Sequence, residues 1–398
     1  LHYRGIGRDD SFFRVGGNSL PAVRMQSRIH DKLGLSFNMG AFYGAPTIEA
    51  LAAGHQMNHI QQAIRDSQAD IAMPHPARPG QEASAPRSVL LTGARGFLGC
   101  FLLDELLRRC EVVHCLLRCR DEAEGMASLL KQAEAAGISP DWSRVRVVPG
   151  DLAEPELGLS ECTRQRLAAE TDGIVHCGAF VHHLHNYATM KASNVDATEA
   201  LLRLALTDRQ KLFCFVSTLS VASAIDGAVR AEEAVLSNPP VVDNGYLLTK
   251  WVGEQRVARY AAQLGLPAVI ARAGNITGSS VNGFSNYDRN HFWLFNKGCL
   301  QLGAYPDMSE TVEMTPVDHL ARAIAALALA PRKELLVANL SNPATLSLRA
   351  FFAALAGCGF TAKAEAPAEW QKRLASIGEE NALSQIKDFY TGDLSATP

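Results

Sequence analysis

A short apolar strand, a glycine-rich turn and a helix, in that order, constrain this chain more than any other feature. The strand Val89–Leu91 runs into Thr92-Gly93-Ala94-Arg95-Gly96-Phe97-Leu98-Gly99. Gly93 allows a tight turn, Gly96 lets backbone N–H groups approach a pyrophosphate, and Gly99 lets the following helix pack on the strand. The alternative is an ordinary glycine-rich turn. The order of the three elements favours a dinucleotide phosphate site, formed by Gly93, Ala94, Arg95, Gly96, Phe97, Leu98 and Gly99.

Short apolar runs alternate with helical patterns from Arg87 onward. This alternation predicts parallel strands with crossover helices, a Rossmann-type doubly wound sheet of the α/β class. The predicted strands are Val89–Leu91, Val112–Leu117, Val145–Val148, Gly173–Cys177, Leu212–Val216 and Ala268–Ala271. Beyond residue 278 we expect a smaller, mostly helical substrate-side part. Its aromatic residues either line a pocket or fill a core. These residues are Phe284, Tyr287, Phe292, Trp293 and Phe295.

Two arginines follow the second predicted strand, where a dinucleotide site reads the adenosine ribose. An acid at this place suits the 2′-hydroxyl of NADH, whereas arginine suits the 2′-phosphate of NADPH. Arg118 and Arg120, with Arg95 nearby, therefore favour NADPH. The alternative is an NADH site in which Asp121 or Glu122 is the acid, although both come slightly later in the sequence than such an acid usually does.

Two further turns lie at strand ends that should face the cofactor. Asp151 and Leu152 follow the third strand, and Asp151 is placed to meet the adenine amino group unless it only caps a turn. Gly178 and Ala179 follow the fourth strand and would let the dinucleotide lie close to the backbone.

The predicted chemistry depends on a Tyr-x-x-x-Lys pair, which places a phenol and an ammonium on one helix face. We expect the ammonium to lower the pKa of the phenol. The chain has two such pairs, Tyr187/Lys191 and Tyr246/Lys250. Tyr246 opens the helix after the strand that ends near Thr218, at the edge where active groups gather. Tyr187 comes one strand too early, so we interpret it as a packing residue with a solvated Lys191.

Composition excludes several classes of partner. The 398 residues carry 38 Lys and Arg against 41 Asp and Glu, so no nucleic-acid or charged membrane surface is indicated. The longest apolar stretch, Ala323–Ala330, is far short of the roughly 20 residues that a membrane helix needs. Nine scattered cysteines without a Cys-x-x-Cys pair favour reduced thiols in a soluble, cytoplasmic protein. The start at Leu1 suggests a piece of a longer chain.

Other polar candidates are given structural interpretations. His182, His183 and His185 lack the helical spacing of a zinc pair, so we expect loop or pocket-lining histidines and no metal site. Cys177 is expected in the core, because no basic residue is placed to activate it.

The N-terminal segment reads Phe12-Phe13-Arg14-Val15-Gly16-Gly17-Asn18-Ser19-Leu20, with Ser19 at a helix start. From the residues alone Ser19 is a helix cap after a glycine turn. The segment nevertheless resembles the peptidyl carrier domains of nonribosomal peptide synthetases over about residues 1–63. The resemblance implies a 4′-phosphopantetheine arm on Ser19, attached by a phosphopantetheinyl transferase. It also implies that the first carrier helix would precede Leu1, and that Thr47 caps the last one.

The remainder resembles the thioester reductase domains of peptide synthetases and carboxylic acid reductases, in the extended short-chain dehydrogenase/reductase family. The motifs are the glycine turn, Ser217-Thr218-Leu219-Ser220-Val221, Gly245–Glu254, Arg272–Gly278 and Glu313–Asp318. The resemblance implies that Thr218, Tyr246 and Lys250 are catalytic. It adds Asn194, Lys250, Gly274, Asn275 and Ile276 to the cofactor site. Ala273 and Thr249 depart from the usual proline and serine, and neither change removes a reacting group.

The expected organisation is a carrier domain at 1–65, a Pro-rich linker at 66–86 that lets the carrier swing, and a reductase domain at 87–398. Within the reductase, 87–278 is mainly Rossmann and 279–398 mainly substrate-side. The implied reaction is NADPH-dependent reductive release of an aminoacyl or peptidyl thioester delivered by upstream synthetase modules. Rival interpretations are an epimerase or dehydratase of a free sugar nucleotide, and a docking module without activity. The sequence does not identify the acyl group.

Overall fold

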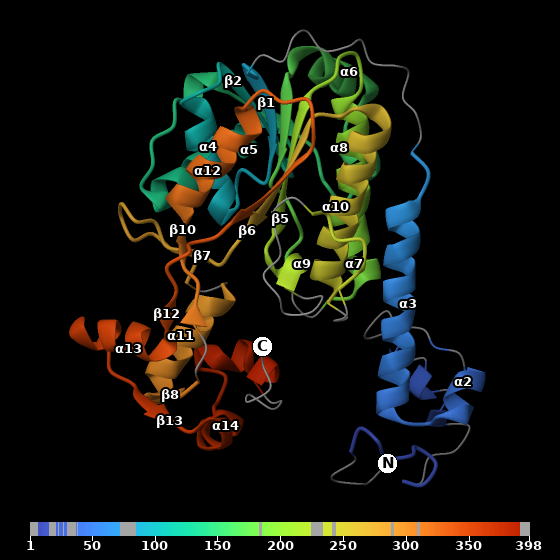
Figure 1. Ribbon diagram of the computed structural model, residues 1–398, viewed down its shortest axis with the longest axis vertical. Coiled ribbons are helices and arrows are strands. Elements are labelled where there is room, and N and C mark those ends of the chain that lie inside the picture. The colour runs from blue at the N-terminus through green and yellow to red at the C-terminus, as the bar shows by residue number, and fades with distance from the viewer. Residues whose placement is uncertain are drawn as a thin grey trace.

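The computed structural model describes residues 7–15, 21–22, 24–26, 28–29, 37, 39–71, 85–182, 185–223, 234–240, 244–287, 290–308 and 311–390. Figure 1 shows three parts, which in chain order are a small helical part, a central sheet covered by helices, and a second helical part. Ser19 and His183 lie outside the described residues, so their predicted roles remain predictions.

The central sheet has seven parallel strands in the order β11-β6-β5-β4-β1-β2-β3. This order confirms the predicted doubly wound fold. The strand order reverses between β1 and β4, and such a switch point is where dinucleotides bind. The strands are β1 (Ser88–Thr92), β2 (Val112–Leu117), β3 (Val145–Pro149), β4 (Gly173–His176), β5 (Leu212–Thr218), β6 (Ala268–Ala273) and β11 (Leu336–Leu340).

Helices cover both faces of the sheet (Figure 1). Successive strand residues point to opposite faces, so Val89 and Leu91 enter one apolar core while Leu90 enters the other. One face carries α4 (Phe97–Leu107), α5 (Glu122–Ala136) and α12 (Val317–Leu329), and the other carries α6 (Glu161–Glu170), α8 (Ala197–Ala205) and α10 (Gly245–Leu264). Near α10 lie α7 (Tyr187–Lys191), the π-helical turn η3 (Ala192–Asp196) and α9 (Ser220–Ser223).

The seventh strand was not predicted, and it corrects the expected division at residue 278. β11 pairs with β6, and α12 packs its apolar face on the same core as α4. Residues 317–340 therefore return to the Rossmann part. The run Leu336–Ala338 is too short to distinguish a strand from a buried helix segment by pattern alone.

The C-terminal helical part has its own apolar core around Trp370, whose side chain is fully buried. Its elements are α11 (His291–Leu302), α13 (Leu348–Gly357), α14 (Pro367–Ala375), β8 (Ala304–Pro306), β13 (Lys363–Glu365), η4 (Ala382–Gln385) and η5 (Lys387–Tyr390). Short strands connect it to the sheet, namely β7 (Ile276–Thr277), β9 (Thr311–Val312), β10 (Thr315–Pro316) and β12 (Leu346–Ser347). Two further 3-10 turns are η1 (Trp142–Arg144) and η2 (Pro155–Gly158).

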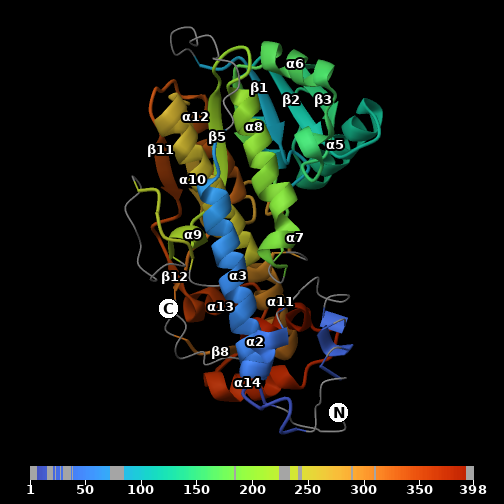
Figure 2. The same ribbon diagram turned by 90° about the vertical axis from the view of Figure 1, so that its right-hand side faces the viewer.

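The N-terminal part contains α2 (Met39–Gly44) and the long helix α3 (Ile48–Gln68). Thr47 caps α3 as predicted, since its hydroxyl accepts a hydrogen bond from Ala50 N at 3.0 Å. Phe12 and Phe13 pack around Phe42 with ring centroids 5.5 and 6.0 Å away. Figure 2 shows α3 running along α10, which corrects the predicted linker: α3 continues past residue 66, and its C-terminal end lies on the reductase.

Among the described residues, no helix combines the length and apolar character that a membrane crossing requires. The nine cysteines are all free thiols.

Candidate active site

The glycine turn has the geometry that the sequence predicts. Gly93 has a φ of +80°, and a Cβ there would lie 2.6 Å from Gly178 N. A Cβ on Gly99 would lie 2.0 Å from the carbonyl oxygen of Gly93, so only glycine allows α4 to pack this closely. Gly96 caps α4 without a side-chain hydrogen bond, which leaves the first N–H groups of the helix for a ligand.

A cleft of about 1670 Å³ opens at the switch point and extends between the Rossmann part and the C-terminal helical part. It contacts the carboxyl ends of β1, β4 and β5 and residues of α11. The predicted site residues that line it are Gly93, Arg95, Gly96, Phe97, Leu98, Gly99, Arg118, Asp151, Leu152, Gly178, Ala179, Thr218, Tyr246, Lys250, Gly274, Asn275 and Ile276.

Three predicted residues do not line the cleft. Ala94 is fully buried behind the turn. Arg120 points away and forms an ion pair with Glu124 at 2.9 Å. Asn194 is buried and holds the backbone of Phe180, accepting from its N–H at 2.7 Å and donating to its carbonyl at 2.9 Å. Asn194 thus positions the loop after β4 and does not face the cleft.

Arg118 lines the cleft directly after β2. Its side chain is 77% exposed and lies 3.9 Å from the Asp151 carboxylate. Asp151 also accepts a hydrogen bond from Ala153 N at 2.9 Å. Asp151 therefore caps the turn after β3, which was the alternative role expected for it. Asp121, the alternative acid, caps α5 by accepting from Glu124 N at 2.8 Å.

Thr218, Tyr246 and Lys250 line the same cleft. Asn244 caps α10 by accepting from Leu247 N at 3.1 Å, and this cap fixes the first turn, which carries Tyr246. Lys250 is 4% exposed, and its Nζ donates to the carbonyl of Val216 at 2.8 Å. The same Nζ lies 6.0 Å from the centre of the Tyr246 ring.

Burial has the largest effect on the pKa values of Tyr246 and Lys250. It contradicts the expectation that Lys250 lowers the pKa of the phenol. Burial raises the pKa of Tyr246 above its ordinary value, so Lys250 does not make the phenol acidic in the free protein. Burial lowers the pKa of Lys250 to about 8. The loss of water around the phenol on burial is the largest effect on its pKa. Tyr246 is therefore a protonated donor at neutral pH.

A buried hydrogen-bond chain beneath the glycine turn was not predicted. The hydroxyl of Thr198 donates to Asn194 O at 2.6 Å, so its oxygen accepts from His176 Nε2–H at 3.1 Å. Nδ1 of His176 then accepts from Thr92 at 2.7 Å, and Thr92 accepts from Gly178 N at 2.9 Å. Burial lowers the pKa of His176 to about 3, which keeps this neutral tautomer. The only signal in the sequence is a histidine at the end of a buried strand.

A second buried network supports the strand ends beside Thr218. Arg272 and Glu254 are both fully buried and form two hydrogen bonds, at 2.7 and 3.0 Å. Ser217 donates to Glu254 at 2.6 Å. The network connects β5, β6 and α10, so it fixes the position of Thr218 on β5 relative to Lys250 on α10.

Cys177 is half-buried, because it packs against the apolar core and also lines the cleft. Burial raises the pKa of Cys177 to about 11, although Lys250 lies close enough to oppose this. His182 lines the cleft and packs on His185 with ring centroids 4.0 Å apart. No three His, Cys, Asp or Glu side chains among the described residues gather as a metal ion requires. Phe292 and Phe295 both line the cleft and pack in the C-terminal core.

A doubly wound sheet with a glycine cradle at its switch point and a Tyr-x-x-x-Lys helix at the same edge defines a protein of short-chain dehydrogenase/reductase type. Residues 91–324 match the NAD-binding family described as male sterility protein, and residues 4–54 match the phosphopantetheine attachment site family. The chain belongs to this NAD-binding family and carries a phosphopantetheine attachment domain in front of it.

Similar proteins combine the same two parts. The chain is 34% identical to a component of the linear gramicidin synthase of Brevibacillus parabrevis, over 99% of this chain and 8% of that protein. It is 31% identical to L-2-aminoadipate reductase of Saccharomyces cerevisiae, over 95% of this chain and 30% of that protein. The chain therefore spans less than a third of either relative.

Two solved structures resemble the fold. The terminal R domain from the myxalamid PKS-NRPS pathway is 35% identical, with a TM-score of 0.78 over 85% of this chain and 86% of that one. A thiolation-reductase di-domain from an archaeal non-ribosomal peptide synthetase is 25% identical, with a TM-score of 0.66 over 98% and 85%. These likenesses confirm the resemblance to carrier and reductase didomains of peptide synthetases.

Proposed function

We propose that this chain releases an aminoacyl or peptidyl group from its own carrier domain by NADPH-dependent reduction of the thioester. The observation that carries the proposal is that one cleft is lined both by the glycine cradle and by Thr218, Tyr246 and Lys250. The fused attachment domain supports a substrate tethered through Ser19. The proposed partners are upstream synthetase modules and a phosphopantetheinyl transferase.

The cradle fits a dinucleotide, because the uncapped N-terminus of α4 and the close approach at Gly93 leave backbone donors for a pyrophosphate. When bound, NADPH supplies a hydride to the thioester carbonyl. Tyr246 and Thr218 donate hydrogen bonds to the oxygen as negative charge grows on it, and Tyr246 gives it a proton. The new hydroxyl then returns its proton to Tyr246 as the carbon–sulfur bond breaks, and the departing sulfur takes a proton from solvent, which frees an aldehyde and the pantetheine thiol. A second round would give an alcohol.

Lys250 has a binding role in this proposal. Its ammonium would hold the nicotinamide ribose while its bond to Val216 O fixes the side chain. The cofactor site beside Lys250 would be lined by Gly274, Asn275 and Ile276. Two buried residues would support it without contacting the cofactor: Ala94 behind the glycine turn and Asn194 behind the loop after β4.

The test is nucleotide oxidation by the chain loaded at Ser19 with an acyl-phosphopantetheine. We expect NADPH to be consumed in preference to NADH, one NADPH for each aldehyde and two for each alcohol found by mass spectrometry. Arg118→Ala should raise KM for NADPH about tenfold and leave KM for NADH unchanged, because it removes one charged contact to the 2′-phosphate.

Arg120→Ala is the matched control. Arg120 pairs with Glu124 away from the cleft, so this variant should keep the NADPH preference. Equal use of NADH by the unsubstituted chain would contradict the cofactor assignment. No nucleotide oxidation with any thioester would favour a docking module over an enzyme.

The pH dependence should follow Lys250. Its pKa of about 8 in the free protein lies below the ordinary lysine value, so the ammonium is present below pH 8 and is lost above it. Because kcat/KM reports the free enzyme, kcat/KM for NADPH should fall as pH rises through about 8. Lys250→Arg keeps its charge, so any residual activity should lose this limb. A flat profile from neutral pH to pH above 9 would contradict the role.

A further inference from the structure

The C-terminal turns of α3 present an apolar stripe to the reductase. Ile60, Ala63, Ile64 and Ser67 follow the spacing of one helix face. Ala63 is fully buried in a core cluster that it shares with residues of α7 and α10, among them Trp251. Both ribbon views place α3 along α10 (Figures 1 and 2). One face of this part of α3 is thus buried against the reductase.

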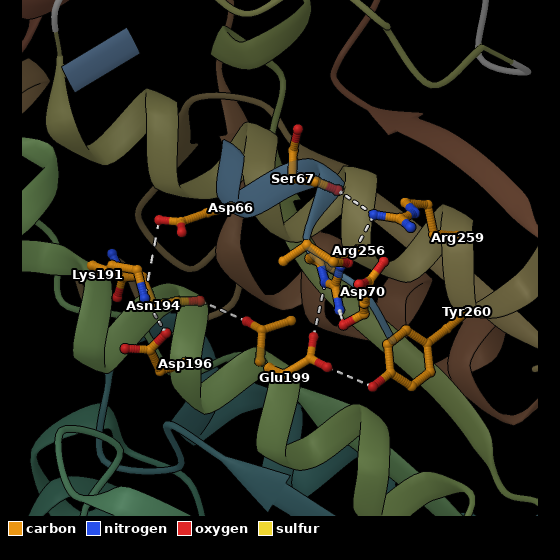
Figure 3. A network of polar contacts seen from close by, with 12 residues as sticks. Asp66, Ser67, Asp70, Lys191, Asn194, Asp196, Glu199, Arg256, Arg259 and Tyr260 are labelled. Carbon is orange, nitrogen blue, oxygen red and sulfur yellow. Dashed lines mark hydrogen bonds and ion pairs between the residues drawn. The ribbon is translucent and has the colours of Figure 1, made fainter. Parts of the chain in front are cut away.

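A polar contact beside the stripe joins α3 to α7. The hydroxyl of Tyr187 donates to the Asp66 carboxylate at 2.7 Å. Lys191 Nζ lies 4.0 Å from the same carboxylate (Figure 3). Tyr187 is fully buried, and a buried hydroxyl needs a hydrogen-bond acceptor from the protein. The Asp66 carboxylate is that acceptor. The expected solvated Lys191 is instead paired, with Asp196 at 2.6 Å as well.

The end of α3 is held by two arginines of α10. Arg259 donates to the carbonyls of Ser67 and Ala69 at 3.1 and 2.9 Å, and Arg256 donates to the carbonyl of Ala69 (Figure 3). The last carbonyls of a helix lack partners within the helix and attract cations. Arg256 is 3% exposed and is fixed from behind by Glu199 at 2.8 Å. The receptor for the helix end is therefore preorganised in the reductase.

We infer that residues 60–70 are a fixed anchor of the carrier on the reductase, held by a clasp of Asp66, Tyr187, Lys191, Arg256 and Arg259. The connection between the carrier and the reductase then ends at residue 60, not at residue 86. By shortening this connection, the clasp raises the effective concentration of the carried thioester at the cleft. This last consequence rests on the proposed function.

The anchor itself is tested by amide hydrogen exchange on the full chain. Ala63→Glu places a charge at the fully buried contact and should speed exchange of residues 60–68 at least tenfold. Ala52→Glu makes the same change at an exposed position of the same helix and should leave that exchange unchanged. Tyr187→Phe, which removes only one hydroxyl, should speed exchange in the same segment to a smaller extent. Unchanged exchange in both interface variants would overturn the inference.

The catalytic consequence is tested by comparing two substrates. Ala63→Glu should slow reduction of the thioester carried on Ser19 about fivefold or more, since effective concentration falls steeply as a flexible connection lengthens. Reduction of a free acyl-pantetheine thioester should stay within twofold of the unsubstituted chain. Equal slowing of both substrates, or of neither, would overturn this role. If the unsubstituted chain reduced neither thioester, the proposed function would fail while the exchange experiment still decided the anchor.

Discussion

Replacing Tyr246 with phenylalanine should lower kcat for thioester reduction by about 10²–10⁴-fold, because the variant lacks the hydroxyl that delivers a proton to the reacting oxygen. Burial raises the pKa of this phenol, so the group is protonated and ready to donate across neutral pH. The ring stays in place, and only one oxygen atom is lost. The measurement is single-turnover oxidation of NADPH with a free acyl-pantetheine thioester.

Tyr187→Phe is the matched control, because Tyr187 also has a lysine four residues later but lies at the carrier contact. It should keep kcat with the free thioester. NADPH affinity should be unchanged in both variants. A Tyr246→Phe chain within threefold of the unsubstituted rate would contradict the assignment of Tyr246 as the proton donor.

Replacing Glu254 with alanine should cost about 3–5 kcal/mol of unfolding free energy, because it leaves Arg272 charged and unpaired where neither side chain contacts water. Ser217 would lose its acceptor too. Equilibrium urea unfolding measures the effect. We expect that Glu254→Leu combined with Arg272→Met recovers more than half of the loss, since an apolar pair removes both buried charges.

The surface pair between Arg87 and Glu111 supplies the comparison. Its side chains are 74% and 62% exposed, so Glu111→Ala should leave unfolding without measurable change. A Glu254→Ala variant as stable as Glu111→Ala would show that water reaches the inner pair.

Local pattern was enough for the parts of the fold that repeat a simple rule. Apolar runs and glycines predicted six of the strands and the turn at Gly93, because strand burial and backbone approach are dictated within a few residues. The place of Tyr246 after the strand ending at Thr218 was also predictable, since parallel strands bring their carboxyl ends to one edge.

Other features depend on contacts between residues far apart in the chain. β11 became visible only through its pairing with β6, and Arg120 left the predicted cofactor site because Glu124 lies one helical turn away from it. The Tyr187 pair looked the same as the Tyr246 pair in sequence. Only its contact with Asp66, 121 residues away, shows what it does.

The sequence by itself determined six strands of the central sheet, the phosphate cradle and the residues available for chemistry, because each follows from the pattern within one segment. Only the tertiary structure decided how those groups are charged and where the carrier is held. The pKa values of Tyr246 and Lys250 depend on burial by distant segments, and the helix end at Ala69 meets Arg256 only when α3 and α10 lie side by side. Desolvation and packing are properties of the assembled chain, and no local pattern encodes them.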